Sequence, residues 1–193
     1  MRIIGGNRRG LRLAEVGEGD AAAHLRPTSD RVREAIFNLL INGKHAGNPV
    51  QGARVLDLFA GTGAMGLEAL SRGATEVVFV DDGAKALALL RANVAKMRAE
   101  GETRILRQDA RHLPANPGAL FTLVFLDPPY GKQLGEAALA AAIRNGWLAP
   151  GAMVVWEEST TPVLPSGMTQ LDQRRYGDTI VTLLAASDQG TSP

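Results

Sequence analysis

Apolar and polar positions follow two different periods along this chain, and the change of period divides it into strands and helices. From residue 54 onward, short apolar runs rich in Val, Leu and Phe alternate with segments in which apolar residues recur every three or four positions. Apolar runs of this kind are typical of buried strands, and the longer spacing is typical of helices with one buried face. The pattern predicts strands at 54–59, 76–80, 104–107, 120–126, 152–156 and 179–185, and helices that end at Arg72 or span 84–99 and 136–145.

This alternation predicts an α/β fold with a mostly parallel sheet and helices on both of its faces. The segments 152–156 and 179–185 have no clear helix between them. One of these two strands is therefore expected to run antiparallel to the others.

The first 50 residues have a different pattern. Turn signals at residues 5–7 and 17–20 predict an irregular or hairpin-forming segment up to about residue 25. A helix should follow, with Thr28 or Ser29 as its N-cap, Asp30 at the positive end of its dipole, and its basic residues on or beside the exposed side. Its buried stripe is expected to comprise Val32, Ala35, Ile36, Leu39 and Leu40. We therefore expect an N-terminal extension at 1–50 packed on a main domain at 51–187, and a disordered tail at 188–193.

Composition narrows the class of protein without identifying it. The chain has 193 residues, of which 45% are hydrophobic, and this suits a globular protein with a single core. It contains no cysteine, which excludes disulfides, thiolate metal sites and a cysteine nucleophile, and which fits the reducing cytoplasm. The N-terminus lacks the apolar stretch of a signal peptide, and no run approaches the roughly 18 apolar residues of a membrane span. Three scattered histidines lack ligand spacing, so no metal is expected.

Basic residues gather near the N-terminus although the net charge is only +1. A concentration of arginines with few acids among them indicates a surface for a polyanion such as RNA. Exposed arginines are also common on any solvated surface, so the pattern alone leaves both interpretations open. The arginines are Arg2, Arg8, Arg9, Arg12, Arg26, Arg31 and Arg33.

A glycine motif follows the first strand of the main domain. Gly61, Gly63 and Gly66 have the G-x-G-x-x-G spacing between a predicted strand and a predicted helix, which is the context of a nucleotide-binding turn. Asp81 ends the second strand, where a carboxylate can bind both ribose hydroxyls of an adenosine. Alternatively, Asp81 and Asp82 open a loop or cap the next helix.

Asp57 narrows the choice of adenosine cofactor. It lies four residues before Gly61, where a carboxylate would repel the pyrophosphate of a dinucleotide but attract the ammonium and sulfonium groups of S-adenosylmethionine. Asp109, at the end of the third strand, is placed to accept a hydrogen bond from the adenine amino group. The alternative for Asp109 is a simple turn residue.

The strand 120–126 ends at Asp127, Pro128, Pro129 and Tyr130. Proline fixes φ and has no N–H to donate, so the strand must stop and Asp127 is held at the end of the sheet where α/β proteins bind ligands. An acceptor carboxylate, a rigid carbonyl and a stacking ring suit a planar base that carries an amino group. The alternative is a plain turn that ends a strand.

Several of these motifs resemble those of known protein families. Residues 55–63, Asp81 and the Asp127–Tyr130 motif resemble the class I S-adenosylmethionine-dependent methyltransferases that methylate amines. Residues 26–38, together with 2–6 and 175–179, resemble the bacterial 16S ribosomal RNA guanine-N2 methyltransferases, the RsmD family. The resemblance covers nearly the whole chain. One departure is Asp81, where this family has glutamate about as often.

The resemblance implies a Rossmann-like fold with a mostly parallel seven-stranded sheet whose last strand is antiparallel, plus a small N-terminal hairpin and helix. Asp127, Pro128, Pro129 and Tyr130 would be catalytic, on a guanine in 16S ribosomal RNA within a small-subunit particle, with a monomer as the default state. The implied cofactor residues are Asp57, Phe59, Gly61, Thr62, Gly63, Asp81, Asp82, Asp109, Ala110 and Asp127. The implied RNA-binding residues are Arg2, Arg8, Arg9, Arg12, Arg26, Thr28, Arg31 and Arg33.

Three alternatives remain open at this point. An amino-methyltransferase that acts on DNA adenine or on a protein glutamine would use the same catalytic motif. An NAD(P)-dependent oxidoreductase shares the glycine turn but leaves Asp57 and the Asp127–Tyr130 motif without a role. A non-catalytic RNA-binding module would explain the arginines alone.

Overall fold

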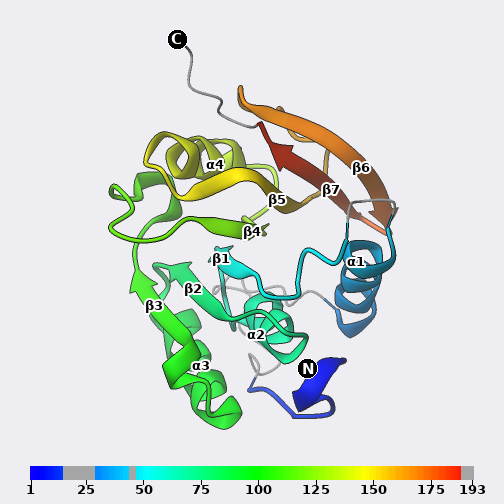
Figure 1. Ribbon diagram of the computed structural model, residues 1–193, viewed down its shortest axis with the longest axis vertical. Coiled ribbons are helices and arrows are strands. Elements are labelled where there is room, and N and C mark those ends of the chain that lie inside the picture. Colours follow the sequence, from blue (N-terminus) through cyan, green and yellow to red (C-terminus); the bar gives the residue numbers. More distant parts are fainter. Residues whose placement is uncertain (15–28, 44–46, 188–193) are drawn as a thin grey trace.

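The computed structural model describes residues 1–14, 29–43 and 47–187, and the structural statements below concern these residues. Helices and strands alternate along most of this part of the chain (Figure 1). The helices are α1 (Asp30–Asn42), α2 (Ala64–Ser71), α3 (Ala84–Met97) and α4 (Leu134–Arg144). The strands are β1 (Arg54–Leu58), β2 (Glu76–Asp81), β3 (Thr103–Arg107), β4 (Phe121–Leu126), β5 (Leu148–Glu158), β6 (Met168–Tyr176) and β7 (Thr179–Ala186).

The described strands form one seven-stranded sheet in the order β3-β2-β1-β4-β5-β7-β6. β1 to β5 pair in parallel, whereas β7 is antiparallel to both of its neighbours, β5 and β6. The prediction of a mostly parallel sheet with its last strand antiparallel is confirmed. The strand order reverses between β1 and β4, and in open α/β sheets the crevice at such a reversal is where ligands bind.

The pattern of apolar positions did not reveal β6. Its sequence from Met168 to Tyr176 is mostly polar, and every one of its residues is at least partly exposed. β6 is the last strand of the sheet and pairs only with β7, so it has little apolar surface to bury. Apolar periodicity therefore could not distinguish this edge strand from a loop.

Each face of the sheet packs against helices. α1, α2 and α3 cover one face, where Val55 and Phe125 point, and α4 covers the other, where Leu56 and Val124 point. This alternation is the two-residue period of a strand buried on both sides. No described helix is long and apolar enough to cross a membrane.

Residues 1–14 form a small hairpin on the α1–α3 face. Arg2 and Arg12 make an antiparallel bridge, and Ile3 N donates to Leu11 O at 2.9 Å. Ile3 and Leu13 are buried in the same core cluster as the sheet. The N-terminal segment therefore shares the core of the main domain. The predicted turn at 17–20 and the predicted tail at 188–193 lie outside the described residues.

The buried face of helix α1 differs from the predicted one. Ser29 is its N-cap and accepts a hydrogen bond from Val32 N at 3.2 Å. The buried face, however, comprises Arg33, Ile36, Phe37 and Leu40, while the predicted stripe members Val32, Ala35 and Leu39 are only half-buried. Arg33 was expected on the exposed side of the helix, and that expectation is wrong.

Candidate active site

The turn after β1 has an unusual backbone. Phe59, Gly61 and Gly63 all have positive φ, at 59°, 56° and 79°. Glycine adopts this region without strain, but phenylalanine does so rarely. A Cβ on Gly63 would lie 2.4 Å from the end of the Leu90 side chain, which would have to move, and the positive φ would also strain a larger residue here. We call residues 59–66 the glycine turn.

Gly66 serves a different purpose from the other two glycines. A Cβ there would lie 2.5 Å from the ring of Phe79 and 2.7 Å from Val77, because α2 packs closely against β2. Its N–H also donates to Asp57 Oδ2 at 2.9 Å. The third glycine thus allows the helix to approach the sheet and brings its backbone to the buried carboxylate.

Three carboxylates lie at neighbouring strand ends beside the glycine turn. Asp57, in β1, is almost fully buried, and this burial raises its pKa well above the ordinary value despite the hydrogen bond from Gly66. The negative charges of Asp127 and Asp81 raise it further. Such an arrangement disfavours a further anion and favours a cation.

Asp81 holds the glycine turn against the end of β2. Its Oδ2 accepts from Gly61 N and its Oδ1 from Gly83 N, both at 2.8 Å. Burial raises the pKa of Asp81, and these two hydrogen bonds oppose that shift. Asp81 thus has the structural role in the loop that the sequence allowed as an alternative. Its contact with the ribose stays a prediction. Asp82 is exposed beside it.

The second strand end carries the predicted catalytic residues. β4 ends at Leu126 as expected, and Asp127 N donates to Leu58 O at 3.4 Å, which places Asp127 beside the end of β1. Asp127, Pro129 and Tyr130 are half-buried and Pro128 is buried. We call residues 127–131 the Asp127 turn.

Two other strands hold the Asp127 turn in place. The hydroxyl of Tyr130 lies 3.1 Å from Thr179 Oγ1 at the start of β7. The N–H of Gly131 donates to Oε1 of the buried Glu158 at the end of β5, at 2.8 Å. The predicted catalytic motif therefore projects from the same edge of the sheet as the glycine turn, next to it.

Comparison with known proteins decides the family. The family model described as "Conserved hypothetical protein 95" matches residues 1–185. Ribosomal RNA small subunit methyltransferase D of Escherichia coli strain K12 is 34% identical over 195 residues, covering 100% of this chain and 93% of that protein. The chain belongs to the RsmD family of methyltransferases.

Two further relatives agree with this assignment. The RsmD protein of Haemophilus influenzae is 34% identical over 183 residues, covering 92% of this chain and 89% of that protein. The solved structure of the Escherichia coli protein yhhF superposes with a TM-score of 0.82 at 34% identity, covering 98% and 99% of the two chains. The Rossmann-like methyltransferase fold expected from the sequence is confirmed.

Asp109 has structural partners in this RsmD-family chain. It is the N-cap of the 3₁₀ turn Ala110–His112, and its Oδ2 pairs with Arg111 Nη2 at 2.6 Å. The hydrogen bond from the Arg111 side chain is the main reason why its pKa lies well below the ordinary range. The turn role that the sequence allowed is therefore present, and the adenine contact stays a prediction.

Sequence reasoning missed Asn93, a fully buried side chain on α3. Its Oδ1 accepts from Ala14 N at 2.6 Å, and its Nδ2 donates to Ala14 O at 3.1 Å and to Thr62 O at 2.9 Å. One amide thus joins the N-terminal hairpin to the glycine turn. The available signal was a polar residue beside the apolar stripe of a predicted helix.

Glu68 on α2, also missed, lies beside the buried Arg33, whose Nη2 donates to Asp30 Oδ1 at 2.8 Å and to Arg2 O. The Glu68 carboxylate is fully buried and accepts from Ile4 N and Gly5 N, both at 2.8 Å, and from Arg72 Nε at 2.6 Å. Arg33 Nε lies 3.7 Å from it. Arg33 lies between α1, α2 and the hairpin with no exposed side-chain surface, so the structure offers no support for its predicted RNA contact, which stays a prediction.

The other predicted RNA-binding residues differ in exposure. Arg2, Arg9, Arg12 and Arg31 are exposed, and Arg8 is half-buried in an ion pair with Glu102 at 2.7 Å. Arg26 and Thr28 lie outside the described residues.

Proposed function

We propose that this chain transfers a methyl group from S-adenosylmethionine to the exocyclic N2 amine of a guanine in small-subunit ribosomal RNA. The relatives named ribosomal RNA small subunit methyltransferase D support the substrate class. The main observation behind the proposal is that the buried carboxylate of Asp57 lies near those of Asp81 and Asp127 beside the glycine turn.

This arrangement fits S-adenosylmethionine better than a dinucleotide. A pyrophosphate would add negative charge beside a carboxylate whose pKa is already raised, whereas a cationic ligand relieves that repulsion. The NAD(P)-dependent alternative is disfavoured for this reason. When bound, S-adenosylmethionine supplies a methyl group on a positively charged sulfur, which leaves as a neutral thioether.

The chain offers suitable groups for each part of this cofactor. Asp57 and the glycine turn, including Phe59 and Thr62, would hold the amino-acid end. Asp81, with Asp82 beside it, would accept hydrogen bonds from the ribose hydroxyls. Asp109 and the buried Ala110 would bind the adenine.

The Asp127 turn would act on the amine. The lone pair of a guanine N2 amine is delocalised into the ring, so the nitrogen is a weak nucleophile. The Asp127 carboxylate and the Pro128 carbonyl would accept its two hydrogens and favour a pyramidal nitrogen whose lone pair is available. The same oxygens stabilise the positive charge that develops on nitrogen as it gains the methyl group.

Asp127 does not need to be a strong base. Once the nitrogen has formed its bond to carbon, it is positively charged and acidic, and its surplus proton can pass to water. Tyr130 would stack on the guanine, which must leave its helix or loop to enter the site. Holding amine and methyl donor in line supplies much of the rate.

Methyl transfer with identified products tests the proposal. Small-subunit particles from a strain that lacks this protein are incubated with the enzyme and tritiated S-adenosylmethionine, and the RNA is digested to nucleosides. With the wild-type enzyme, we expect label above background in N2-methylguanosine. With Asp127→Ala, this label should be absent. Label in methyladenosine or in protein would support the rival amino-methyltransferases, and an absence of transfer would refute the proposal.

A further inference from the structure

Two adjoining cavities lie between helix α1 and the edge strand β6. The first, of about 600 Å³, is lined by Arg31, Val32 and Ala35 on α1 and by Arg175, Tyr176 and Gly177 on the β6 side. The second, of about 680 Å³, continues along the same two elements and is lined by Asn38, Leu39 and Asn42 on α1 and by Leu171, Asp172 and Arg174 on β6. We call the two neighbouring cavities together the α1–β6 groove.

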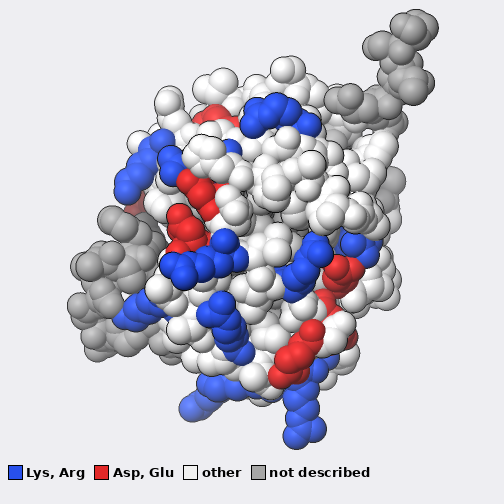
Figure 2. All heavy atoms as spheres, turned by 90° about the vertical axis from the view of Figure 1, so that its left-hand side faces the viewer, with Lys and Arg blue, Asp and Glu red and all other residues white. Residues whose placement is uncertain are grey.

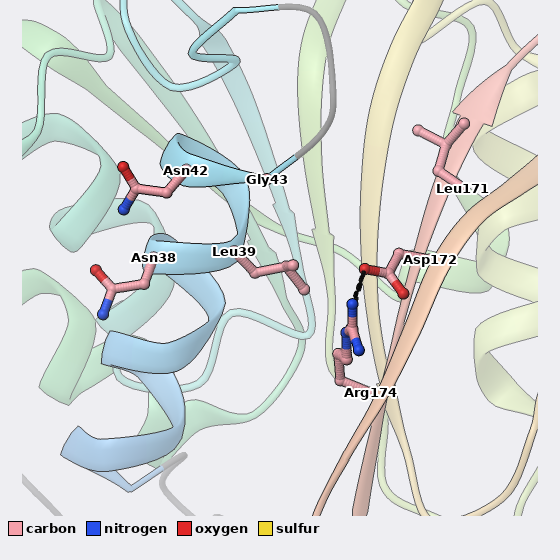
Figure 3. Close-up of a pocket in the computed structure, with 7 residues that line it drawn as sticks. All are labelled: Asn38, Leu39, Asn42, Gly43, Leu171, Asp172 and Arg174. Atoms are coloured by element: carbon pink, nitrogen blue, oxygen red, sulfur yellow. Dashed lines mark hydrogen bonds and ion pairs between the residues drawn. The ribbon is translucent and has the colours of Figure 1, made fainter.

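The groove has an apolar strip with polar residues at its sides. Val32, Ala35 and Leu39 recur at helical spacing and are only half-buried. In Figure 3, Leu39 points from α1 toward Asp172 and Arg174 on β6, whereas the amides of Asn38 and Asn42 point away from β6. Leu171 is 42% exposed. The aliphatic surface left open here can lie against the flat face of a base.

The charges of the groove favour an anionic occupant. Its lining includes three arginines and one acidic residue, Asp172, which pairs with Arg174 at 3.0 Å. Arg31 and Arg175 are exposed and make no ion pair with another described residue. The face that carries β3 and α3 differs, because basic and acidic side chains are interspersed over it (Figure 2).

One end of the α1–β6 groove lies near the Asp127 turn. Tyr176, which lines the first cavity, pairs with Thr179 across the β6–β7 hairpin. Thr179 Oγ1 lies 3.1 Å from the Tyr130 hydroxyl. If the target base of a nucleic-acid chain lies beside Tyr130, the nucleotides next to that base can therefore reach the groove.

We propose that the α1–β6 groove binds the single-stranded stretch of substrate RNA next to the target guanine. Arg31 and Arg175 contact phosphates, and the apolar strip of α1 lies under the bases. Sites that bind single strands combine cationic side chains with aromatic rings on which bases stack, and Tyr176 supplies such a ring in the first cavity. The inference rests on the proposed function and assigns the RNA-binding surface that the function requires.

A charge-matched pair of double variants tests the groove. Arg31→Ala with Arg175→Ala removes two exposed guanidinium groups from the groove, and Arg91→Ala with Arg104→Ala removes two exposed arginines from α3 and β3. The groove variant should weaken RNA binding about 10-fold or more and lower the slope of log K against log salt by about 1.4, the value for two single-strand phosphate contacts. The control variant should stay within about twofold, and cofactor affinity should be unchanged in both.

Crosslinking identifies the occupant directly. A benzophenone amino acid in place of Leu39 should crosslink to RNA within a few nucleotides of the methylated guanine when the enzyme is bound to small-subunit particles. Crosslinks only to ribosomal protein, or equal losses of RNA affinity in the groove and control variants, would overturn the assignment. Methyl transfer by the wild-type chain with no loss in the groove variant overturns only the groove, whereas failure of wild-type transfer refutes the proposed function itself.

Discussion

The glycine turn and the Asp127 turn lie side by side, but they are held in different ways. The glycine turn is held by backbone N–H groups that donate to the carboxylates of Asp57 and Asp81, and most of its residues are buried. The Asp127 turn is stiffened by two prolines and held by side chains from β5 and β7, and its carboxylate is half-exposed.

The difference matches the two tasks we propose for these turns. A cofactor site that binds the same molecule in every cycle benefits from a fixed backbone cradle. A catalytic carboxylate that must meet a base on a large RNA has to be accessible. Substitutions in the two turns should therefore separate cofactor binding from turnover.

Asp127→Ala should have the largest effect on turnover. It removes an acceptor for the amine hydrogens, and loss of one such polar group at a reacting centre typically costs about 100-fold or more in kcat. The glycine turn and Asp57 stay in place, so cofactor affinity by calorimetry should fall far less than kcat, because only one of the three neighbouring carboxylates is lost. Near-normal single-turnover rates in this variant would remove Asp127 from the mechanism.

Asp57→Asn should affect cofactor binding and stability in opposite directions. The variant keeps an acceptor for Gly66 N but loses the charge that attracts a cation, so affinity for S-adenosylmethionine should fall about 10-fold, the effect of ~1.4 kcal/mol. Because burial raises the pKa of Asp57, its ionisation destabilises the folded chain as pH rises through that raised pKa. The variant should therefore melt higher than wild type at pH 8, with a smaller difference at pH 5.

The raised pKa of Asp57 also predicts how the affinity of the wild-type protein for S-adenosylmethionine depends on pH. A cationic cofactor binds the ionised carboxylate, so its affinity should fall as pH decreases through the raised pKa of Asp57, and this dependence should be weaker in Asp57→Asn. Calorimetry between pH 5 and pH 8 measures both. Parallel pH profiles for the two proteins would show that another group controls binding.

Asn93→Leu tests the link between the N-terminal hairpin and the glycine turn. Three hydrogen bonds are lost, and the buried Thr62 carbonyl and the part-buried backbone groups of Ala14 lose their partner, at about 1–3 kcal/mol for a fully buried unsatisfied group. A chain of this size should melt at least ~4 °C lower, and cofactor affinity should fall with it. Unchanged affinity in a destabilised Asn93→Leu protein would confine Asn93 to a structural role.

Tyr130→Phe should have the smallest effect. It keeps the ring that would stack on the base and removes the hydroxyl that contacts Thr179, a hydrogen bond worth about 1 kcal/mol, so kcat should fall less than about fivefold. Tyr130→Ala, which also removes the ring, serves as the comparison and should raise KM for RNA much more. Equal defects in the two variants would mean that the hydroxyl and not the ring is the important group.

Local features of the sequence predicted much of the fold. The strands β1, β2 and β4 are buried apolar runs, and the glycine turn and the Asp127 turn follow from the backbone preferences of glycine and proline, which depend little on distant residues. Edge strand β6 could not be found in this way because it buries few apolar side chains.

The predictions that failed or were missed depend on contacts between distant segments. Arg33 has the sequence context of an exposed helical arginine, but the structure buries it among Asp30 on its own helix, the Arg2 carbonyl of the hairpin and Glu68 on α2. Asn93 gains its role from Ala14 and Thr62, which are 79 and 31 residues away in the chain. The apolar pattern of α3 contains neither of these partners of Asn93.

A structure of the chain with S-adenosylhomocysteine and an RNA fragment that contains the target guanine would test the central claim most directly. We expect the guanine amine within hydrogen-bond distance of the Asp127 carboxylate and the Pro128 carbonyl, with the sulfur on the opposite side of the nitrogen near Asp57. A base bound elsewhere, with the Asp127 carboxylate turned away from the glycine turn, would contradict the account.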